Sequence, residues 1–162
     1  MLVMGVLFEY FSAISNDVAA SVIDRPGGPA SSTGAPSETP PHVAFDVVAT
    51  KGIDPVVQLG NLEALLTERP FDDVRASPRS GALVDIRDDG ELLVLAVTDE
   101  LTAALAAADT AKLAEVAAPW SQTEEFYGRA DPEDLVPFLV DLAGLARRAT
   151  AQGFALYCWV CV

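Results

Sequence analysis

Two apolar stretches constrain the fold of this chain most: "MLVMGVLF" at residues 1–8 and "FALYCWVCV" at residues 154–162. Each is far shorter than the roughly 18 to 20 residues that cross a bilayer. Both are rich in residues that favour strands, and such strands are usually buried. We therefore expect core strands at residues 2–11 and 154–162, with Gly5 marking a bulge or a close approach.

Length and composition favour one domain without disulfide or metal staples. The chain has 162 residues, 51% of them hydrophobic, and a mean hydropathy of +0.29. Such a chain is large enough to bury a sizeable core. Two cysteines do not make a disulfide framework. A signal peptide is disfavoured because no Lys or Arg precedes the first apolar run and Glu9 interrupts it. We expect a cytoplasmic protein.

The chain is strongly acidic. Ten Lys and Arg against 24 Asp and Glu give a formal net charge of −14. This charge repels nucleic acids and anionic membranes, so we expect neither as a partner. It favours solubility and, if the protein has a partner, a basic one.

Cap and turn signals divide the first half of the chain. Ser15 or Asn16 is a candidate N-cap of a short helix over residues 15–23. The Pro-, Gly- and Ser-rich segment 25–42 predicts a mobile surface loop within the domain. A strand is expected at residues 42–49. The clearest helix follows at residues 54–69, where Asp54 is the expected cap and Pro55 occupies the first helical position.

The second half begins with the strongest hairpin signal, two apolar runs around "DDG" in residues 82–98. Thr98 is expected to cap a helix over residues 99–108, and a second helix over residues 109–118 is expected to end at Pro119. Ser121 and Glu124 have capping-box spacing before the short segment 121–128.

The longest helix is predicted over residues 131–153 and ends at Gly153. Its buried face is expected to consist of Leu135, Phe138, Leu139, Leu142, Leu145 and Ala149. Pro137 predicts either a start near Asp134 or a kink. The order of elements indicates one α+β domain over residues 1–162, with a mixed sheet of about five strands, terminal strands in the core and helices packed on it.

The spacing of Cys158 and Cys161 matches C-x-x-C, but its context is that of a strand. Residues three apart on a strand point to opposite faces, with Cα atoms about 10 Å apart. Disulfides need Cα atoms within about 7 Å, so we expect no bridge. His42, the one histidine, does not complete a zinc site with them. The motif is predicted to be core, with a redox pair as the alternative.

Other candidate chemistry is sparse, and the sequence contains no phosphate-binding loop. His42 lies in the Pro-rich segment, where precise placement of a base is not expected. Arg75 and Arg79 offer a grip for a carboxylate or phosphate, with a solvated loop as the alternative. Paired carboxylates such as Glu124 and Glu125 have helix-capping explanations. No cofactor and no metal is expected.

The segment "PWSQTEEFYGRADPED" mixes aromatic residues with five carboxylates and one arginine. Aromatic residues anchor protein interfaces, and charge steers partners of opposite sign. The segment is therefore a candidate binding patch for a basic protein. The alternative is that Trp120 and Phe126 fasten a short helix to the core. The candidate contact residues are Trp120, Glu124, Glu125 and Tyr127.

The order of elements resembles that of the YfbM-like family of small bacterial proteins of unknown function. The resemblance is carried by "MGVLF", "LEALLT", "VTDELTAALAAADTAKLAEV" and "FLVDLAGLARRATAQGFALYCWV", and as a pattern of elements it covers about two thirds of the chain. Members of that family tend to carry Lys, Trp and His in the helix before "LLT", whereas "DPVVQLGNLEALLT" has none of them. The resemblance implies a fold and no activity.

Two functions are consistent with these residues. The first is a non-enzymatic, immunity-like or regulatory protein that binds a basic partner. The second is a small-molecule binding protein or carboxylate-dependent enzyme whose pocket forms only in the fold, with Asp54, Asp85 and Glu124 as nominal candidates. The sequence leaves the oligomeric state open.

Overall fold

The computed structural model describes residues 6–25, 27–30 and 45–162, which form a five-stranded sheet with the order β2-β1-β5-β4-β3. The predicted α+β class is confirmed, with the first and last strands at the centre of the sheet. All four pairings are antiparallel, which corrects the expected mixed sheet. The strands are β1 (Leu7–Ala13), β2 (Val47–Lys51), β3 (Leu83–Arg87), β4 (Leu92–Ala96) and β5 (Ala155–Cys161).

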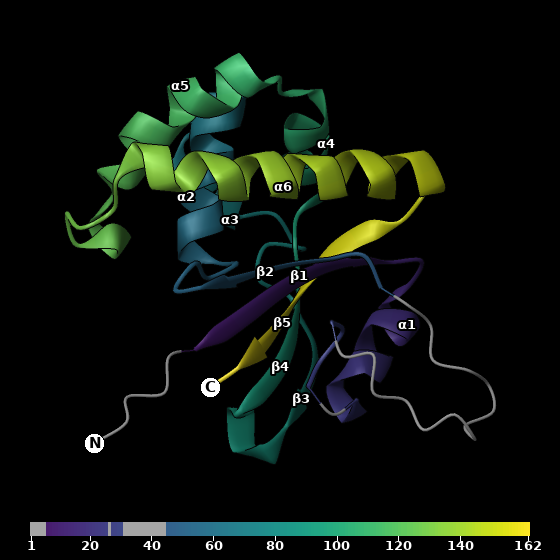
Figure 1. Cartoon of the computed structure of the whole chain (residues 1–162). Helices are drawn as coiled ribbons and strands as arrows, with labels where there is room; N and C mark the ends of the chain where they lie inside the picture. The colour runs from purple at the N-terminus through teal and green to yellow at the C-terminus, as the bar shows by residue number, and fades with distance from the viewer. Residues whose placement is uncertain (1–5, 26, 31–44) are drawn as a thin grey trace.

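The helices form a thick layer on one face of the sheet and a thin one on the other (Figure 1). The thick layer, the helix layer, consists of α2 (Val57–Thr67), α4 (Asp99–Ala107), α5 (Thr110–Ser121) and α6 (Pro132–Gln152). The short α3 (Phe71–Arg75) packs against α2. The thin layer consists of α1 (Asn16–Ala20) and the 3-10 turn η1 (Ser21–Asp24).

Side-chain alternation along β5 divides the core between the two layers. Leu156, Cys158 and Val160 pack toward the helix layer, whereas Tyr157 and Trp159 pack toward α1. A strand with both faces covered carries a nearly continuous apolar run, as the sequence of this segment does. Its place between β1 and β4 therefore confirms the prediction that the stretch is core.

Most predicted caps are present. The side chains of Ser15 and Thr98 accept hydrogen bonds from the first-turn amides of α1 and α4, and Asp131, which was not predicted as a cap, does the same for α6. Gly153 ends α6 in the left-handed conformation at φ 72°. The Asp54 carboxylate accepts from the Val56 and Val57 amides at 2.9 and 2.7 Å, although the helix itself begins at Val57.

Both internal prolines lie within helices, which corrects two predictions. α5 continues through Pro119 to Ser121, and α6 begins at Pro132 and contains Pro137. A proline removes the bond to the carbonyl four residues earlier. Here both prolines lie on exposed helix faces, where water can pair with that carbonyl. Ser121 belongs to α5, and its hydroxyl donates to the Ala118 carbonyl, so the expected capping box is absent.

The predicted hairpin is formed by β3 and β4 around the turn η2 (Asp88–Gly90). Gly60 lets α3 pack closely on α2, because a Cβ there would lie 2.8 Å from the Phe71 ring. Gly5, His42 and most of the predicted loop at residues 25–42 lie outside the described residues.

Candidate functional site

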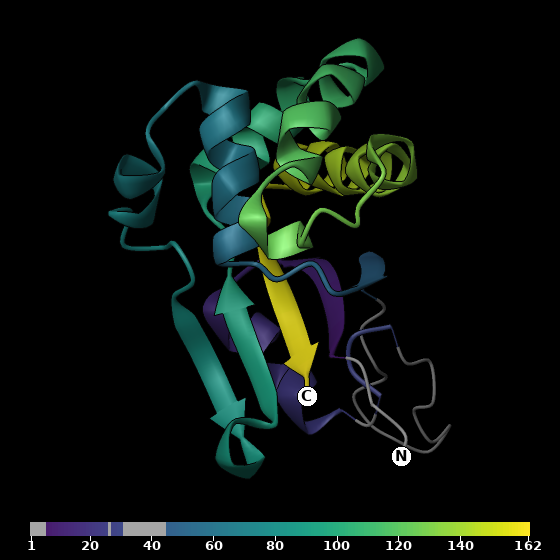
Figure 2. The same cartoon turned by 90° about the vertical axis from the view of Figure 1, so that its left-hand side faces the viewer.

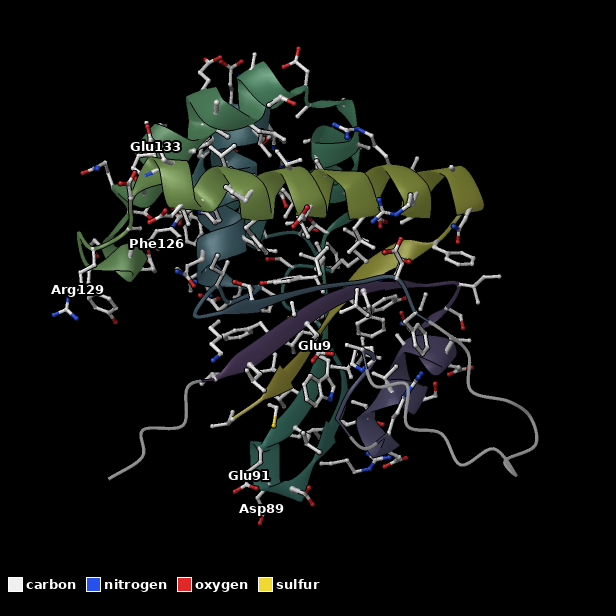
Figure 3. The ribbon with its side chains drawn as sticks, viewed as in Figure 1. Glu9, Asp89, Glu91, Phe126, Arg129 and Glu133 are labelled. Atoms are coloured by element: carbon white, nitrogen blue, oxygen red, sulfur yellow. The ribbon has the colours of Figure 1, made fainter. Side chains whose placement is uncertain are left out.

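The candidate patch lies in the connection between α5 and α6, residues 122–131, which we call the α5–α6 loop. It contains the 3-10 turn η3 (Glu124–Phe126) and protrudes at one end of the helix layer. Figure 3 shows Phe126, Arg129 and Glu133 together at this end of the molecule. The loop is thus separate from the hairpin tip, where Asp89 and Glu91 lie.

Trp120 lies at the base of this loop and is fully buried. Its indole Nε1 donates a hydrogen bond of 2.8 Å to the Gln58 carbonyl on α2. The Phe126 ring meets the indole edge to face, with ring centroids 5.0 Å apart. Trp120 is therefore a core residue and not a contact residue of the patch, as the alternative prediction had it.

The Glu125 side chain is also hydrogen-bonded within the protein. Its Oε2 accepts a hydrogen bond of 2.9 Å from the Asn61 side chain on α2. Together with the Phe126 contact, this bond ties the turn η3 to the helix layer at two points. The base of the loop is anchored by packing and hydrogen bonding.

The remaining predicted contact residues, Glu124 and Tyr127, are exposed. The Tyr127 side chain is 83% exposed, more than any other large hydrophobic side chain in the described part of the chain. Its backbone has φ 54°, a left-handed conformation that costs a non-glycine residue roughly 1 kcal/mol. An exposed aromatic residue in a strained position is a candidate for binding rather than for stability.

A second site, which the sequence did not predict, is the buried carboxylate of Glu63 on α2. Its side chain is only 1% exposed, and its Oε1 accepts a hydrogen bond from the Thr98 hydroxyl. Its Oε2 has no hydrogen-bond partner among the described residues. Burial raises the pKa of Glu63, partly opposed by the Thr98 hydroxyl.

Glu63 faces a cavity of about 10 Å³ between α2 and the start of α4, lined also by Ser80 and Thr98. A cavity of this size is just large enough to hold one water molecule, which could donate a hydrogen bond to Glu63 Oε2. The sequence does contain a signal for the site: Glu63 follows Leu59 by four residues and so lies on the buried stripe of α2.

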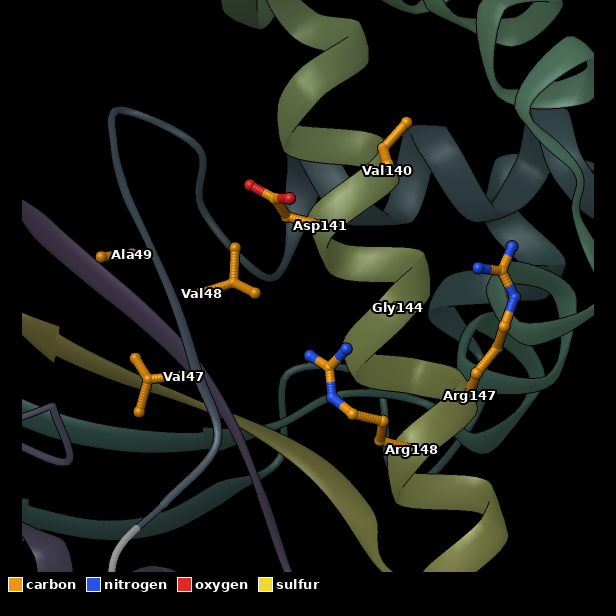
Figure 4. A pocket seen from close by; sticks show the side chains of 8 residues that line it. All are labelled: Val47, Val48, Ala49, Val140, Asp141, Gly144, Arg147 and Arg148. Carbon is orange, nitrogen blue, oxygen red and sulfur yellow. The ribbon is translucent and has the colours of Figure 1, made fainter.

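A groove of about 510 Å³ lies between β2 and α6 (Figure 4). Both of its arginines are already hydrogen-bonded within the protein. The Arg148 guanidinium bonds both oxygens of Asp46, one of them at 3.1 Å. Arg147 donates to the Ala106 and Ala108 carbonyls. Asp141 adds a negative charge to the groove. The groove therefore offers shape but no free pair of cations for an anionic ligand.

The other nominal candidates do not gather at one place. Asp54 caps α2, Asp85 lies on β3 against Arg87 at 2.7 Å, and Glu124 lies in the α5–α6 loop. Arg75 lies over the Phe71 ring with its guanidinium carbon 5.9 Å from the centroid. The structure thus assembles no cluster of carboxylates from these residues.

Arg79 is a structural clamp, because its half-buried guanidinium is bonded to backbone carbonyls of the protein itself. Its Nε donates to the Val97 carbonyl at 2.7 Å and its Nη2 to the Leu156 carbonyl at 3.2 Å. The guanidinium also lies 4.9 Å from the centroid of the Tyr157 ring. The side chain therefore joins the segment after β4 to the start of β5.

Cys158 and Cys161 are both unbridged and belong to the two different core clusters. Burial raises the pKa of the Cys158 thiol well above its ordinary value, which disfavours the reactive thiolate. Across residues 6–25, 27–30 and 45–162, no group of three or more His, Cys, Asp or Glu side chains is placed to hold a metal ion.

Comparisons with protein-family models, with curated proteins and with solved structures find no match for this chain. The resemblance to the YfbM-like family remains a prediction. Among the helices that the structure describes, none is both long enough and apolar enough to span a membrane.

Proposed function

We propose that this protein is a non-enzymatic binding protein, immunity-like or regulatory, and that it binds a basic partner protein through the α5–α6 loop. The observation that carries the proposal is Tyr127, an 83% exposed aromatic side chain held in a left-handed conformation. The same proposal includes a cytoplasmic location and a bacterial origin, like that of the YfbM-like family that the chain resembles.

A rigid base supports this role for the loop. Trp120 and Phe126 pack inside, and Asn61 holds Glu125, so Tyr127 projects from an anchored turn. A pre-organised contact residue loses less conformational entropy on binding than one on a free segment. The loop therefore has the two properties of an interface hot spot, an aromatic anchor and a fixed position.

Charge supports a basic partner. Glu124, Asp131, Glu133 and Asp134 are exposed around the loop, and Arg129 is its one cation. The whole chain carries a net charge of −14, so its long-range field attracts cationic proteins. Such steering raises the association rate at low salt and weakens as salt screens it.

The test is a low-salt capture experiment on extract of the source cells with four tagged proteins. These are the wild type, Tyr127→Gly, Glu68→Gly and the double variant Glu124→Gln/Glu133→Gln. Glu68 is the matched control, because it is an exposed residue with φ 53° that ends α2 far along the chain from the loop. Glycine relieves the same backbone strain at both positions.

The expected result is a basic protein that the wild type and Glu68→Gly capture equally and that added salt releases. Tyr127→Gly should bind it about tenfold or more weakly, as the loss of an aromatic hot spot does. The double variant should associate more slowly. Capture that is unaffected by Tyr127→Gly, or no basic protein at low salt, would refute the proposal.

The alternative, a small-molecule binding protein, has one candidate location in the groove of Figure 4. A thermal-shift screen of metabolites and divalent metals tests it. A ligand whose stabilisation is lost in an Arg148→Met variant would favour this alternative, and a flat response to all compounds would remove it.

A further inference from the structure

We propose a second binding surface: the helix-side face of β3 and β4 binds a basic amphipathic helix of a partner protein, whose apolar residues pack on Leu83 and Ile86. This surface lies on the hairpin and does not include the α5–α6 loop, so the inference stands independently of the function proposed for that loop.

Leu83 and Ile86 each belong to a row of side chains that crosses the sheet and whose other members lie in the core. Residues opposite one another on neighbouring antiparallel strands share a face of the sheet. In two such rows the members on β1 and β5 are buried, whereas Leu83 and Ile86 on β3 are 55% and 45% exposed. The rows are Ile86–Leu93–Val160–Phe8 and Leu83–Leu95–Cys158–Tyr10.

The helix layer does not extend over β3. Apart from the turn η2 of its own hairpin, the helical elements in repeated contact with β3 are α1 and η1, which lie on the opposite face of the sheet. Figure 2 shows the β3–β4 hairpin reaching downward, away from the helices α2 and α4 to α6. The apolar face therefore continues past the last helix that covers it, and one more helix would complete the layer.

A helix fits this surface better than an added strand. The Ile86 amide donates to the Asp85 carboxylate at 2.8 Å, and the same oxygen holds Arg87 at 2.7 Å. An incoming strand would have to displace this local bond to use the amide, which is one way in which edge strands resist pairing. A helix needs no backbone bonds from the edge, because it packs through side chains.

Carboxylates at the hairpin tip favour a basic helix. Asp88, Asp89 and Glu91 are exposed in the turn between β3 and β4, and Figure 3 shows Asp89 and Glu91 at the tip. A five-residue strand spans roughly 13 Å, which corresponds to two to three turns of a helix. A partner helix that covers this span and continues toward the tip can place lysines beside these carboxylates while its apolar residues pack on Leu83 and Ile86.

The test uses a defined probe, a 14-residue amphipathic helix with leucines on one face and lysines on the other. Its binding to the full chain is measured by amide chemical shifts and by titration. The decisive variant is Ile86→Lys. Ile14→Lys is its matched control, because Ile14 is 66% exposed after β1 and the change in charge is the same. Thermal melts check that both variants fold.

We expect shifts concentrated in β3 and β4, an affinity that falls with salt, and at least tenfold weaker binding by Ile86→Lys than by Ile14→Lys. A probe with glutamates in place of the lysines should bind at least tenfold more weakly. Equal affinity of the two variants, or no shift in β3, would overturn the proposal. Self-association of the chain that Ile86→Lys abolishes would also overturn it, because a second copy would then cover the face.

The same experiment separates this surface from the α5–α6 loop. Tyr127→Gly should bind the probe like the wild type, whereas it should lose the partner captured through the loop. A negative result at one of the two surfaces therefore does not contradict the proposal for the other surface.

Discussion

The buried carboxylate of Glu63 leads to a specific prediction: Glu63→Gln should make the protein more stable at neutral pH. The glutamine has nearly the same shape and keeps the oxygen that accepts from the Thr98 hydroxyl. It replaces Oε2 with an amide NH2 group and removes the possibility of a negative charge at a buried position. A buried charge without full hydrogen bonding is costly, and Oε2 has no partner among the described residues.

The size of the effect follows from proton linkage. Burial raises the pKa of Glu63 in the folded state, whereas the unfolded chain titrates at about 4.3. Between these two pKa values the folded protein holds a proton that the unfolded chain has released. The contribution of Glu63 to stability is therefore complete below the unfolded pKa and is lost as the pH rises through the folded pKa. Within the window the loss is about 1.4 kcal/mol per pH unit.

Burial makes the largest contribution to the width of that window, and neighbouring groups adjust it. Glu100 raises the pKa of Glu63 further, whereas Arg69 and the Thr98 hydroxyl lower it. The difference between variant and wild type should therefore begin at about pH 4.3, grow with pH across the window and become constant above the folded pKa. Other carboxylates titrate alike in both proteins, so they cancel in the difference.

Urea unfolding followed by fluorescence of the buried Trp120 and Trp159, repeated from pH 4 to pH 8, measures this difference. The control is Glu68→Gln, which changes an exposed carboxylate at the C-terminal end of the same helix, α2. Its difference in stability from the wild type should be nearly independent of pH. A flat difference for Glu63→Gln, or a variant less stable than the wild type at pH 7, would show that Glu63 is not a destabilised buried carboxylate.

Three further outcomes are expected from contacts in the structure. Arg79→Lys should destabilise the protein by about 2 to 3 kcal/mol in urea unfolding, because lysine replaces neither the paired carbonyl bonds nor the stacking on Tyr157; a loss below about 0.5 kcal/mol would show that the clamp is dispensable. Trp120→Phe should destabilise the protein by about 2 to 4 kcal/mol, since it removes the bond to Gln58 and leaves a cavity beside Phe126. A loss of stability well below this range would indicate that Trp120 is a surface contact residue and not a core residue. Cys158 should react with a thiol reagent only on unfolding, because the side chain is fully buried and its pKa is raised; rapid modification of Cys158 in the native protein, read by mass spectrometry, would reopen a redox role.

The sequence predicted local structure well where short-range chemistry decides it. Ser15, Thr98 and Gly153 act at helix ends through bonds to their nearest neighbours, and each lies where its residue type predicts. The hairpin around Gly90 is equally local. The prolines were predicted less well, because Pro119 lies inside a helix that the burial of Trp120 extends.

The candidate site divides in the same way. The sequence identified the acidic aromatic segment, but it did not determine which aromatic residue faces solvent. Trp120 turned inward because α2 offers a carbonyl for its indole, and Tyr127 turned outward at a left-handed turn. The orientation of Trp120 depends on a helix partner 62 residues away in the chain, which no local pattern encodes.

By itself the sequence determined the α+β class, the strand nature of the C-x-x-C segment and the strong negative charge, because these follow from residue types, their periodicity and their count. Only the tertiary structure decided that Glu63 Oε2 has no partner among the described residues, that Arg79 is a clamp and that the face of β3 is left uncovered. The physical reason is that burial, carbonyl partners and uncovered faces are made by segments far apart in the chain, and they exist only once those segments pack together.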